Sequence, residues 1–416
     1  MRPLLVSCSD ISGGAARATW RLHRALVAQG IASHLYVAAK QSDDWRTQGP
    51  AGKAGRLLAR MRPYAGSATM RLQRTENPTL HSPALLPSQM RARLSAGAAD
   101  VVNLHWVCGE MVSVEDIGRI TKPVVWTLHD MWAFCGAEHY AQDGDGVRWR
   151  QGYEKDNRGP GHGGLDIDRW VWRRKRKAWK RPFHIVTPSR WLADCARGSA
   201  LMHDWPVTVM PNALDTNTFK PLPKNLAREI LGLPQEPRLV LFGAIGGGRD
   251  PRKGWDLLQP ALTQVAGRVP NVHGVIFGQG EPQHPLQLGL PLHWMGHLHD
   301  DTTIALLYSA ADVMVVPSRQ EAFGQTASEA QACGCPVVAF NVTGLPDVVE
   351  HGTTGYLAES YSSEDLAKGI AWVLEDTERH AQLGAQARAR AVRLWSPEVV
   401  VPQYLEVYQA AIDRQG

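Results

Sequence analysis

Two glutamates, eight positions apart, form the most distinctive chemical pattern in the chain. Glu321 and Glu329 belong to the stretch Pro317–Ala330, in which a polar loop containing Gly324 follows a short apolar run. Because a helix is expected to begin near Gln325, the two carboxyl groups would lie roughly 10 Å apart. That separation suits the two ends of an extended ligand and is too wide for a shared proton. The alternative is one acid at a helix start and one solvated helix acid, without a ligand.

A glycine-rich loop followed by two cations forms a second candidate site. Residues Gly243–Gly248 follow an apolar run, and Arg252 and Lys253 stand directly before an expected helix. A helix start presents N–H groups to a phosphate, and glycines let the main chain approach it closely, so this stretch could hold a diphosphate. It is not a P-loop, because Lys253 is followed by Gly254 instead of Ser or Thr. The alternative is a surface loop with ordinary charges.

Two weaker candidates lie in the first half of the chain. His129 ends the expected strand Val124–His129, so it would lie at the carboxyl edge of a sheet, facing a cleft between domains. A single histidine at a strand end is more often structural than catalytic, and the same holds for His105. Gly13 and Gly14 form a turn without the Gly-x-Gly-x-x-Gly spacing, which disfavours a dinucleotide site but suits a bound anion.

The elements that must position these residues follow from an alternation of short apolar runs and helical patterns. This order predicts an α/β protein with parallel, doubly wound sheets. The simplest arrangement is two Rossmann-like domains, residues 1–205 and 206–395, joined near Val207–Pro221. The expected strands are Leu4–Ser7, Ser33–Ala38, Val101–Trp106, Val124–His129, His184–Thr187, Arg238–Phe242, Val272–Phe277, Val313–Val316 and Val337–Phe340. The expected helices are Ala15–Gln29, Arg169–Arg181, Trp255–Val269, Asp301–Ala310, Thr326–Cys333 and most of Ser363–Gln409.

The charges are divided unevenly between the two halves. Residues 1–205 contain 30 Lys and Arg against 18 Asp and Glu, a net of +12, whereas residues 206–416 contain 15 against 22, a net of −7. Two segments concentrate the cations: residues 45–75, with an apolar set at Leu57, Leu58 and Met61, and residues 169–181, with three tryptophans. Such segments suit an anionic membrane surface, and solvated helix faces are the alternative. No nucleic-acid-binding module is visible, so nucleic acid is not expected as a partner.

Six cysteines in 416 residues form no disulfide framework, and the single Cys333-x-Cys335 pair lacks the second pair of a typical zinc site. No metal ligand set is therefore expected. No apolar run approaches the roughly 20 residues needed to cross a bilayer, and the N-terminal apolar run is too short for a signal peptide. We expect a cytoplasmic protein, peripheral on the inner face of the cytoplasmic membrane.

Taken together, these motifs resemble the retaining family 4 glycosyltransferases of the GT-B fold. Glu321–Glu329 is similar to the family's Glu-x7-Glu signature, and Arg252–Gly254 is similar to its Arg-Lys-Gly donor-phosphate motif. Pro211–Pro221 is similar to the segment that enters the second domain. Val124–Tyr140, with Thr187–Leu192, is similar to a bacterial subgroup from exopolysaccharide clusters, such as colanic-acid-type transferases.

This resemblance implies transfer of a sugar from a nucleotide-diphosphate sugar, with retention at the anomeric carbon and without a metal or other cofactor. It also implies that a C-terminal helix, residues 396–416, crosses back to the first domain. Arg252 and Lys253 would neutralise the leaving diphosphate, and Glu329 would hold the ribose hydroxyls. The implied catalytic residues are His129, Glu321, Arg252 and Lys253, and the implied donor-binding residues are Gly13, Gly14, Arg249, Phe323, Gly324, Gln325, Thr326 and Glu329.

One departure from the family keeps a second function open. The family often has Gly-Arg where this chain has Gly243-Ala244, and Arg249 is a candidate replacement for the missing cation. We expect a transferase that acts on a saccharide acceptor, linked to polyprenyl diphosphate, in bacterial surface polysaccharide or exopolysaccharide synthesis. The alternative is a catalytically silent subunit that binds a nucleotide sugar and scaffolds a membrane assembly.

Overall fold

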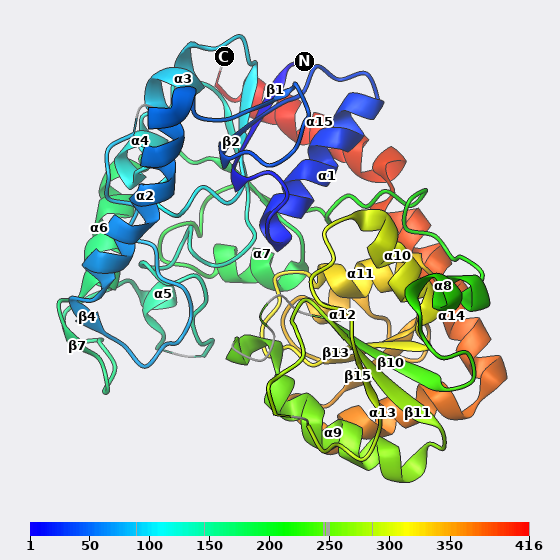
Figure 1. The fold of residues 1–416 in the computed structure, drawn as a ribbon. Helices are drawn as coiled ribbons and strands as arrows, with labels where there is room; N and C mark the ends of the chain where they lie inside the picture. The colour runs from blue at the N-terminus through cyan, green and yellow to red at the C-terminus, as the bar shows by residue number, and fades with distance from the viewer. Residues whose placement is uncertain (89, 145, 244–245, 247–249, 285, 416) are drawn as a thin grey trace. The chain divides into compact units, whose positions relative to one another are not determined.

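The computed structural model describes residues 1–415 except 89, 145, 244–245, 247–249 and 285. The chain divides into two compact units (Figure 1): Met1–Met210 together with Val401–Gly416, and Pro211–Val400. Each unit has a parallel β-sheet of its own. The predicted domain boundaries at residues 205 and 395 stay predictions.

The sheet of the first unit has the strand order β3-β2-β1-β5-β6-β8-β9, and its pairings are parallel. The direction of chain progression reverses between β1 and β5, as in a doubly wound sheet. The strands are β1 (Pro3–Ser9), β2 (His34–Ala39), β3 (Thr47–Gln48), β5 (Val101–Leu104), β6 (Val124–Thr127), β8 (His184–Thr187) and β9 (Val207–Val209).

Seven helices precede the unit boundary in the part of the first unit that the structure describes. They are α1 (Gly14–Ala28), α2 (Gly52–Met70), α3 (Met90–Ala96), α4 (Val114–Gly118), α5 (Arg148–Gln151), α6 (Ile167–Ala178) and α7 (Arg190–Arg197). A separate antiparallel pair joins β4 (Gln73–Arg74) to β7 (Gly163–Gly164). Aromatic packing fills the core beside β6, where the ring of Trp126 lies 5.2 Å from Trp179 and 6.2 Å from Trp132. These three tryptophans therefore belong to the core of the first unit.

The C-terminal helix α15 (Pro397–Asp413) continues into the first unit, which includes the chain from Val401 onward. There the Tyr408 hydroxyl donates to Oδ1 of Asn103 at 2.7 Å, and the Tyr404 hydroxyl lies 3.3 Å from Oγ1 of Thr127. Both contacts are buried, one within β5 and one at the last residue of β6. The expected return of the C-terminal helix is confirmed.

The sheet of the second unit has the order β12-β11-β10-β13-β14-β15, and its pairings are parallel. Its strands are β10 (Arg238–Gly243), β11 (Val272–Phe277), β12 (Leu292–Trp294), β13 (Val313–Val316), β14 (Val337–Phe340) and β15 (Gly355–Ala358). Its helices are α8 (Lys224–Leu231), the short 3₁₀ helix η1 (Pro251–Lys253), α9 (Trp255–Arg268), α10 (Asp301–Ala310), α11 (Gln325–Ala332), α12 (Leu345–Val348), α13 (Ser363–Glu375) and α14 (Thr377–Trp395). The predicted class, two Rossmann-like domains with parallel sheets, is confirmed.

The described helices include none that combines the length and the apolar character needed to cross a membrane.

Candidate functional site

The two strongest sequence motifs follow neighbouring strands of the second sheet. β10 pairs with β11 on one side and with β13 on the other. The pairing with β13 joins Val240 to Val313 and Phe242 to Val315. Ligands of open α/β sheets bind beyond the carboxyl ends of the strands at such a reversal. The Arg-Lys motif follows β10 and the two-glutamate motif follows β13, so the topology brings them to one place.

An ion pair joins the two motifs beyond the ends of β10 and β13. Nζ of Lys253 lies 2.5 Å from Oε1 of Glu321, and the Ser318 hydroxyl donates to the same oxygen at 2.9 Å. The side chains of Lys253 and Glu321 are 25% and 16% exposed, so both remain within reach of a ligand. The main-chain N–H of Glu321 donates to Oγ1 of Thr343 at 3.0 Å, which fixes the loop. The pair offers a cation and an acceptor side by side.

Arg252 is held next to this pair by a forked ion pair. Its Nε and Nη2 donate to the two carboxylate oxygens of Asp250 at 3.2 and 2.7 Å. Asp250 also caps the 3₁₀ turn, since it accepts from the main-chain N–H of Arg252 at 3.0 Å. The Arg252 side chain is 26% exposed. Arg252 is therefore a positioned, partly exposed cation.

A close approach of two main chains sets the distance between the motifs. Gly254 has a φ of +65°, and a Cβ built there would lie 1.9 Å from the carbonyl oxygen of Pro317. Arg319 also joins the two loops. Its main-chain N–H donates to the main-chain oxygen of Arg252 at 2.7 Å, and its guanidinium pairs with the Asp256 carboxylate at 2.7 and 2.8 Å. A glycine is required after Lys253 for the loops to pack this closely.

The helix α11 begins beside the ion pair. Gly324 caps it with a φ of +93°, and Gln325 and Thr326 are its first residues. Phe323 has its side chain in the core, with its ring 6.0 Å from Trp395, so only its main chain is available to a ligand. The predicted second acid, Glu329, is 4% exposed and accepts a hydrogen bond from the Tyr308 hydroxyl at 2.8 Å. It is far more buried than Glu321.

The predicted glycine turn of the first unit lies between β1 and α1. Gly13 has a φ of +93° and caps α1, while Gly14 is the first helical residue. Because a Cβ at Gly13 would meet nothing within 4 Å, the glycine is needed for its backbone angle alone. The buried carboxylate of Asp10 supports the preceding loop by accepting from the main-chain N–H groups of Gln41 and Ser42 at 3.0 and 2.8 Å.

His129 follows β6 and is joined to a buried chain of hydrogen bonds. Oδ1 of Asn103 accepts from the Tyr408 hydroxyl and lies 3.2 Å from Nε2 of His105. Since the Asn103 amide nitrogen donates to two main-chain oxygens, its Oδ1 is an acceptor, and Nε2 of His105 carries a hydrogen. Nδ1 of His105 then accepts from Nε2 of His129 at 3.0 Å. His129 is left with Nδ1 as its free acceptor.

Both rings of this pair are neutral near pH 7. Burial, opposed by the charge of Asp130, lowers the pKa of His129 to about 4. Burial, followed by the neighbouring His129, holds the pKa of His105 well below its usual value. The rings stack with centroids 5.3 Å apart. His129 therefore suits the role of a neutral hydrogen-bonding group and does not suit that of a cation.

Part of the basic segment 169–181 is buried, although the segment was predicted to face a membrane with its aromatic and basic side chains. Trp172 and Trp179 are buried at 3% and 4% exposure, and Lys175 is fully buried. The Lys175 amino group donates to the main-chain oxygen of Gly136 at 2.7 Å, and burial lowers its pKa to about 8. This part of the prediction is wrong because α6 turns these side chains toward the core. The aromatic and basic residues of the segment that stay exposed are Trp170, Arg173, Arg176, Lys177, Lys180 and Arg181.

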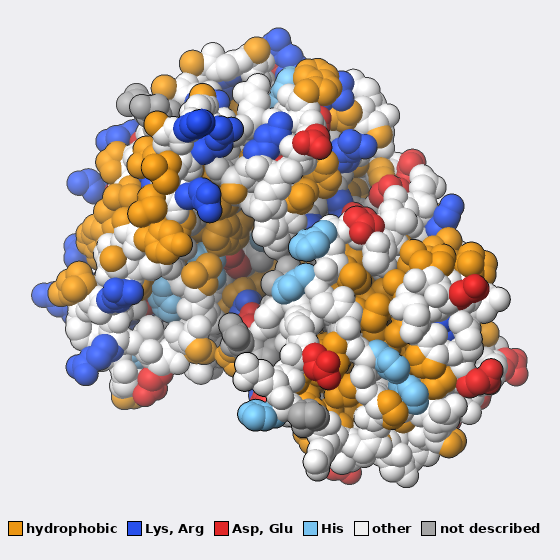
Figure 2. Space-filling model, in the orientation of Figure 1, with side chains coloured by type: hydrophobic (Ala, Val, Ile, Leu, Met, Phe, Trp, Pro, Cys, Tyr) orange, Lys and Arg blue, Asp and Glu red, His pale blue; other side chains and the backbone are white. Residues whose placement is uncertain are grey.

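The segment 45–75 does present a mixed apolar and basic surface. It contains α2, in which Leu57, Leu58, Met61 and Tyr64 are 55–70% exposed. Figure 2 shows hydrophobic side chains beside Lys and Arg over this helix. Arg62 anchors the helix, because its guanidinium donates to three main-chain oxygens.

The structure thus brings together Arg252, Lys253, Glu321 and the start of α11, and it places Gly13, Gly14 and His129 in the other unit. Arg249, together with Ala244, lies outside the described residues. Sequence reasoning missed the partners that hold the predicted residues. Asp250 stands two positions before Arg252 and was readable as a cap, whereas no local signal indicates the remaining partners, Ser318, Thr343, Asn103 and Tyr408.

Two family models match successive parts of the chain. The model described as Glycosyltransferase Family 4 matches residues 12–218, and the model described as Glycosyl transferases group 1 matches residues 224–390. A D-inositol 3-phosphate glycosyltransferase of Thermobispora bispora is 33% identical over 224 residues, which are 50% of this chain and 51% of the relative. The chain thus matches about half the length of this curated relative.

Two solved structures extend the likeness over the whole chain. Sucrose-phosphate synthase from Thermosynechococcus elongatus has a TM-score of 0.68 at 20% identity and covers 99% of each chain. HepE of Anabaena, solved in complex with UDP and glucose, has a TM-score of 0.66 at 20% identity and covers 99% of this chain and all of its own. At this identity the likeness concerns the fold, which is GT-B. The chain therefore carries a glycosyltransferase Family 4 domain followed by a glycosyltransferase group 1 domain.

Proposed function

We propose that this protein transfers a sugar from a nucleotide-diphosphate sugar to a saccharide acceptor, with retention at the anomeric carbon. The observation that carries the proposal is the Lys253–Glu321 pair at the β10–β13 reversal, next to Arg252 and the start of α11. A leaving diphosphate develops negative charge, and fixed cations stabilise it most effectively when they need not reorganise. Two positioned cations replace the charge of a metal, so we propose that transfer requires none.

In this proposal each predicted residue that the structure describes has one role. Lys253 and Arg252 neutralise the diphosphate, and Glu321 accepts hydrogen bonds from the donor sugar. Glu329 holds the ribose hydroxyls, and its contact with Tyr308 orients the carboxylate. The main chain of Phe323, Gly324, Gln325 and Thr326 contacts the sugar and diphosphate. In the first unit, Gly13 and Gly14 line the donor with main chain, and Nδ1 of His129 accepts from a hydroxyl of the transferred sugar.

The decisive experiment is donor turnover by the wild type and two variants. We expect Glu321→Ala and Lys253→Ala both to lose nucleotide release from the donor. Wild-type turnover in either variant would contradict the assigned roles. Added Mg²⁺ or Mn²⁺ should not raise the rate, since the two cations already supply the charge.

The donor base can be approached through the solved relative. HepE was solved with UDP and with UDP-glucose, which supports UDP-sugars as the first donors to test on this chain. A thermal-shift screen should compare UDP-, GDP- and dTDP-sugars. A shift with UDP-sugars alone supports this choice, and a shift with GDP- or dTDP-sugars alone overturns it.

The proposed acceptor is a saccharide linked to polyprenyl diphosphate, in bacterial surface polysaccharide synthesis. The similarity of Val124–Tyr140 to exopolysaccharide transferases supports this class. The relative from Thermobispora bispora bears the name of an inositol 3-phosphate transferase, which favours a phosphorylated polyol as the second candidate. Transfer to inositol 3-phosphate, with none to lipid-linked saccharides, would replace the first acceptor by the second.

We also propose that the protein lies on an anionic membrane surface inside the cell, through α2. Its exposed apolar residues are flanked by exposed cations, and each cation near an anionic surface contributes about 1 kcal/mol. Vesicles with anionic lipid should carry the protein upward in a flotation gradient, and less so at high salt. The variant Leu58→Glu should float less. Equal flotation with neutral and anionic vesicles would contradict the proposal.

The alternative function is a silent subunit that binds a nucleotide sugar and scaffolds a membrane assembly. Ala244, in place of the family arginine, is the feature that favours it. Calorimetry showing tight nucleotide binding, with no turnover against any acceptor pool, would favour this alternative over transfer.

A further inference from the structure

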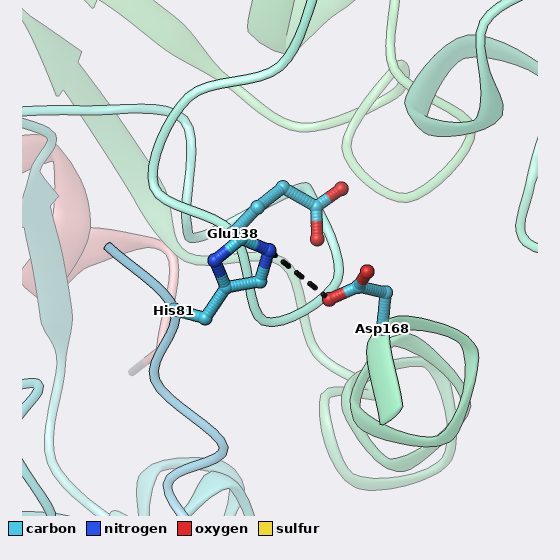
Figure 3. Close-up of side chains that lie close together, drawn as sticks. All are labelled: His81, Glu138 and Asp168. Carbon is cyan, nitrogen blue, oxygen red and sulfur yellow. Dashed lines mark ion pairs between the residues drawn. The ribbon is translucent and has the colours of Figure 1, made fainter. Parts of the chain in front are cut away.

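Three buried side chains of the first unit meet away from the motifs discussed above. His81, Glu138 and Asp168 each offer one ligand atom, and these atoms lie within 4.8 Å of one another. Figure 3 shows the His81 ring facing Asp168, with the Glu138 carboxylate beside them. Glu138 and Asp168 are 6% and 7% exposed, and the His81 side chain is 7% exposed. Segments distant in the sequence therefore place three ligand-type groups at one buried point.

The histidine of this cluster has its lone pair directed into it. Nδ1 of His81 lies 2.7 Å from the main-chain oxygen of Thr79, which can only accept, so Nδ1 carries the hydrogen. Nε2 then has the lone pair. It is buried without a hydrogen-bond partner, and it lies 3.9 Å from Oδ1 of Asp168. A carbonyl that fixes the tautomer in this way is the usual outer partner of a metal-binding histidine.

The carboxylates are oriented from outside in a similar manner. Tyr153 donates its hydroxyl to Oε1 of Glu138, while Oε2 is buried without a hydrogen-bond partner. Gln73 donates to Oδ2 of Asp168 at 2.6 Å. Lone pairs of the three side chains thus converge on one buried point. The other carboxylate oxygens, Oε1 of Glu138 and Oδ2 of Asp168, accept hydrogen bonds from Tyr153 and Gln73.

We propose that Nε2 of His81 and the carboxylates of Glu138 and Asp168 bind one divalent cation, and that the cation is Zn²⁺. Imidazole nitrogen with carboxylate oxygen is a common zinc ligand set, whereas Mg²⁺ and Ca²⁺ prefer oxygen alone. A water molecule can complete four-coordination. The positive charge compensates two buried carboxylates that would otherwise be costly to ionise.

The cation would add a link between three segments that hydrogen bonds already join: Ser82 N–H donates to the Ala137 oxygen at 2.7 Å, and Ala137 N–H donates to Oδ1 of Asp168 at 3.3 Å. His81 lies between β4 and α3, Glu138 in the loop after β6, and Asp168 in the first turn of α6. The loop and the helix approach so closely that a Cβ at Gly136 would lie 2.7 Å from Cα of Asp168. The same loop follows directly after His129. The site is therefore structural, and it does not depend on the proposed transfer reaction.

The direct test is the metal content of the full-length wild-type protein. Elemental analysis after purification without chelators, or after ZnCl₂ titration of chelator-treated protein, should give about one zinc per chain. Removal of zinc should lower the Tm by about 5 °C or more, and ZnCl₂ should restore it. Binding of less than about a tenth of an equivalent of zinc would overturn the proposal, as would saturation by Mg²⁺ in preference to zinc.

Matched variants locate the ion. His81→Gln and Glu138→Gln should bind at least tenfold less zinc, whereas His203→Gln and Glu154→Gln, at exposed positions of the same unit, should bind as the wild type does. Equal zinc content in all four variants would overturn the assignment. If the first two variants do not fold, Co²⁺ titration of the wild type decides. Visible absorption bands that saturate at one equivalent and disappear with excess zinc support the site, and their absence refutes it.

Discussion

Replacing Lys253 by methionine separates the charge of this side chain from its packing. The substitution keeps most of the aliphatic stem and removes the ammonium that lies 2.5 Å from Glu321. Both side chains are partly exposed, at 25% and 16%, and Glu321 keeps its hydrogen bond from Ser318. The free energy of unfolding should therefore fall by about 1 kcal/mol or less.

The effect on catalysis should be much larger than the effect on stability. Removal of one preorganised donor to a developing anion costs about 10²–10³ in rate, or about 3–4 kcal/mol. We expect kcat/KM of Lys253→Met, measured by release of the nucleotide diphosphate, to fall by about this factor.

The matched control is Lys368→Met. This lysine belongs to the same unit, is 67% exposed and lies 3.8 Å from Asp365. It should leave kcat/KM unchanged within about twofold. A kcat/KM of Lys253→Met within about threefold of the wild-type value would show that the ammonium does not act on the leaving group.

Three further predictions concern the supports of the two units. Gly254→Ala should lower both Tm and kcat/KM, because a Cβ there would lie 1.9 Å from the Pro317 oxygen. The control Gly267→Ala, in open space on α9, should leave the free energy of unfolding unchanged or raise it by up to about 1 kcal/mol. Tyr408→Phe should cost about 1 kcal/mol in the unfolding of the first unit, since it removes the buried hydrogen bond to Asn103; urea unfolding by tryptophan fluorescence measures this, and an unchanged midpoint would refute it. The pKa of His129 is about 4 in the folded chain and about 6.5 in the unfolded chain. As the pH falls, His129 therefore binds a proton in the unfolded chain at a higher pH than in the folded chain. Stability should therefore fall as the pH drops from 6.5 to about 4, less steeply in His129→Gln; parallel pH dependences in the two proteins would contradict this.

Three strands of the second unit were predicted to the residue, whereas β12 (Leu292–Trp294) and β15 (Gly355–Ala358) were not predicted. Val272–Phe277, Val313–Val316 and Val337–Phe340 are short apolar runs between turn residues, which leaves one register for a buried parallel strand. The helix Gly52–Met70 was not predicted, since its apolar side chains are exposed and its period carries no core signal. A hydrophobic pattern predicts strands and helices that pack against a core, and it does not predict a helix whose apolar side chains are exposed.

The candidate site was predictable where chemistry and spacing are local. Lys253 and Glu321 stand in motifs beside strand ends, and the parallel topology brings those ends together. Distant pairings have no such signal. Nothing in the sequence joins His81 to Glu138 or Asp168, and the basic segment of α6 gave no sign that Lys175 is buried under main-chain oxygens. Tertiary packing decided these contacts.

The central claim is that the Lys253–Glu321 pair serves a retaining transfer from a nucleotide sugar. The most direct measurement is a proton NMR time course of wild-type protein with UDP-, GDP- and dTDP-sugars and a lipid-linked saccharide acceptor. We expect one nucleotide diphosphate to be released per sugar transferred, and the product to have the anomeric configuration of the donor. An inverted product, or no nucleotide release from any of the three donor classes, would contradict it.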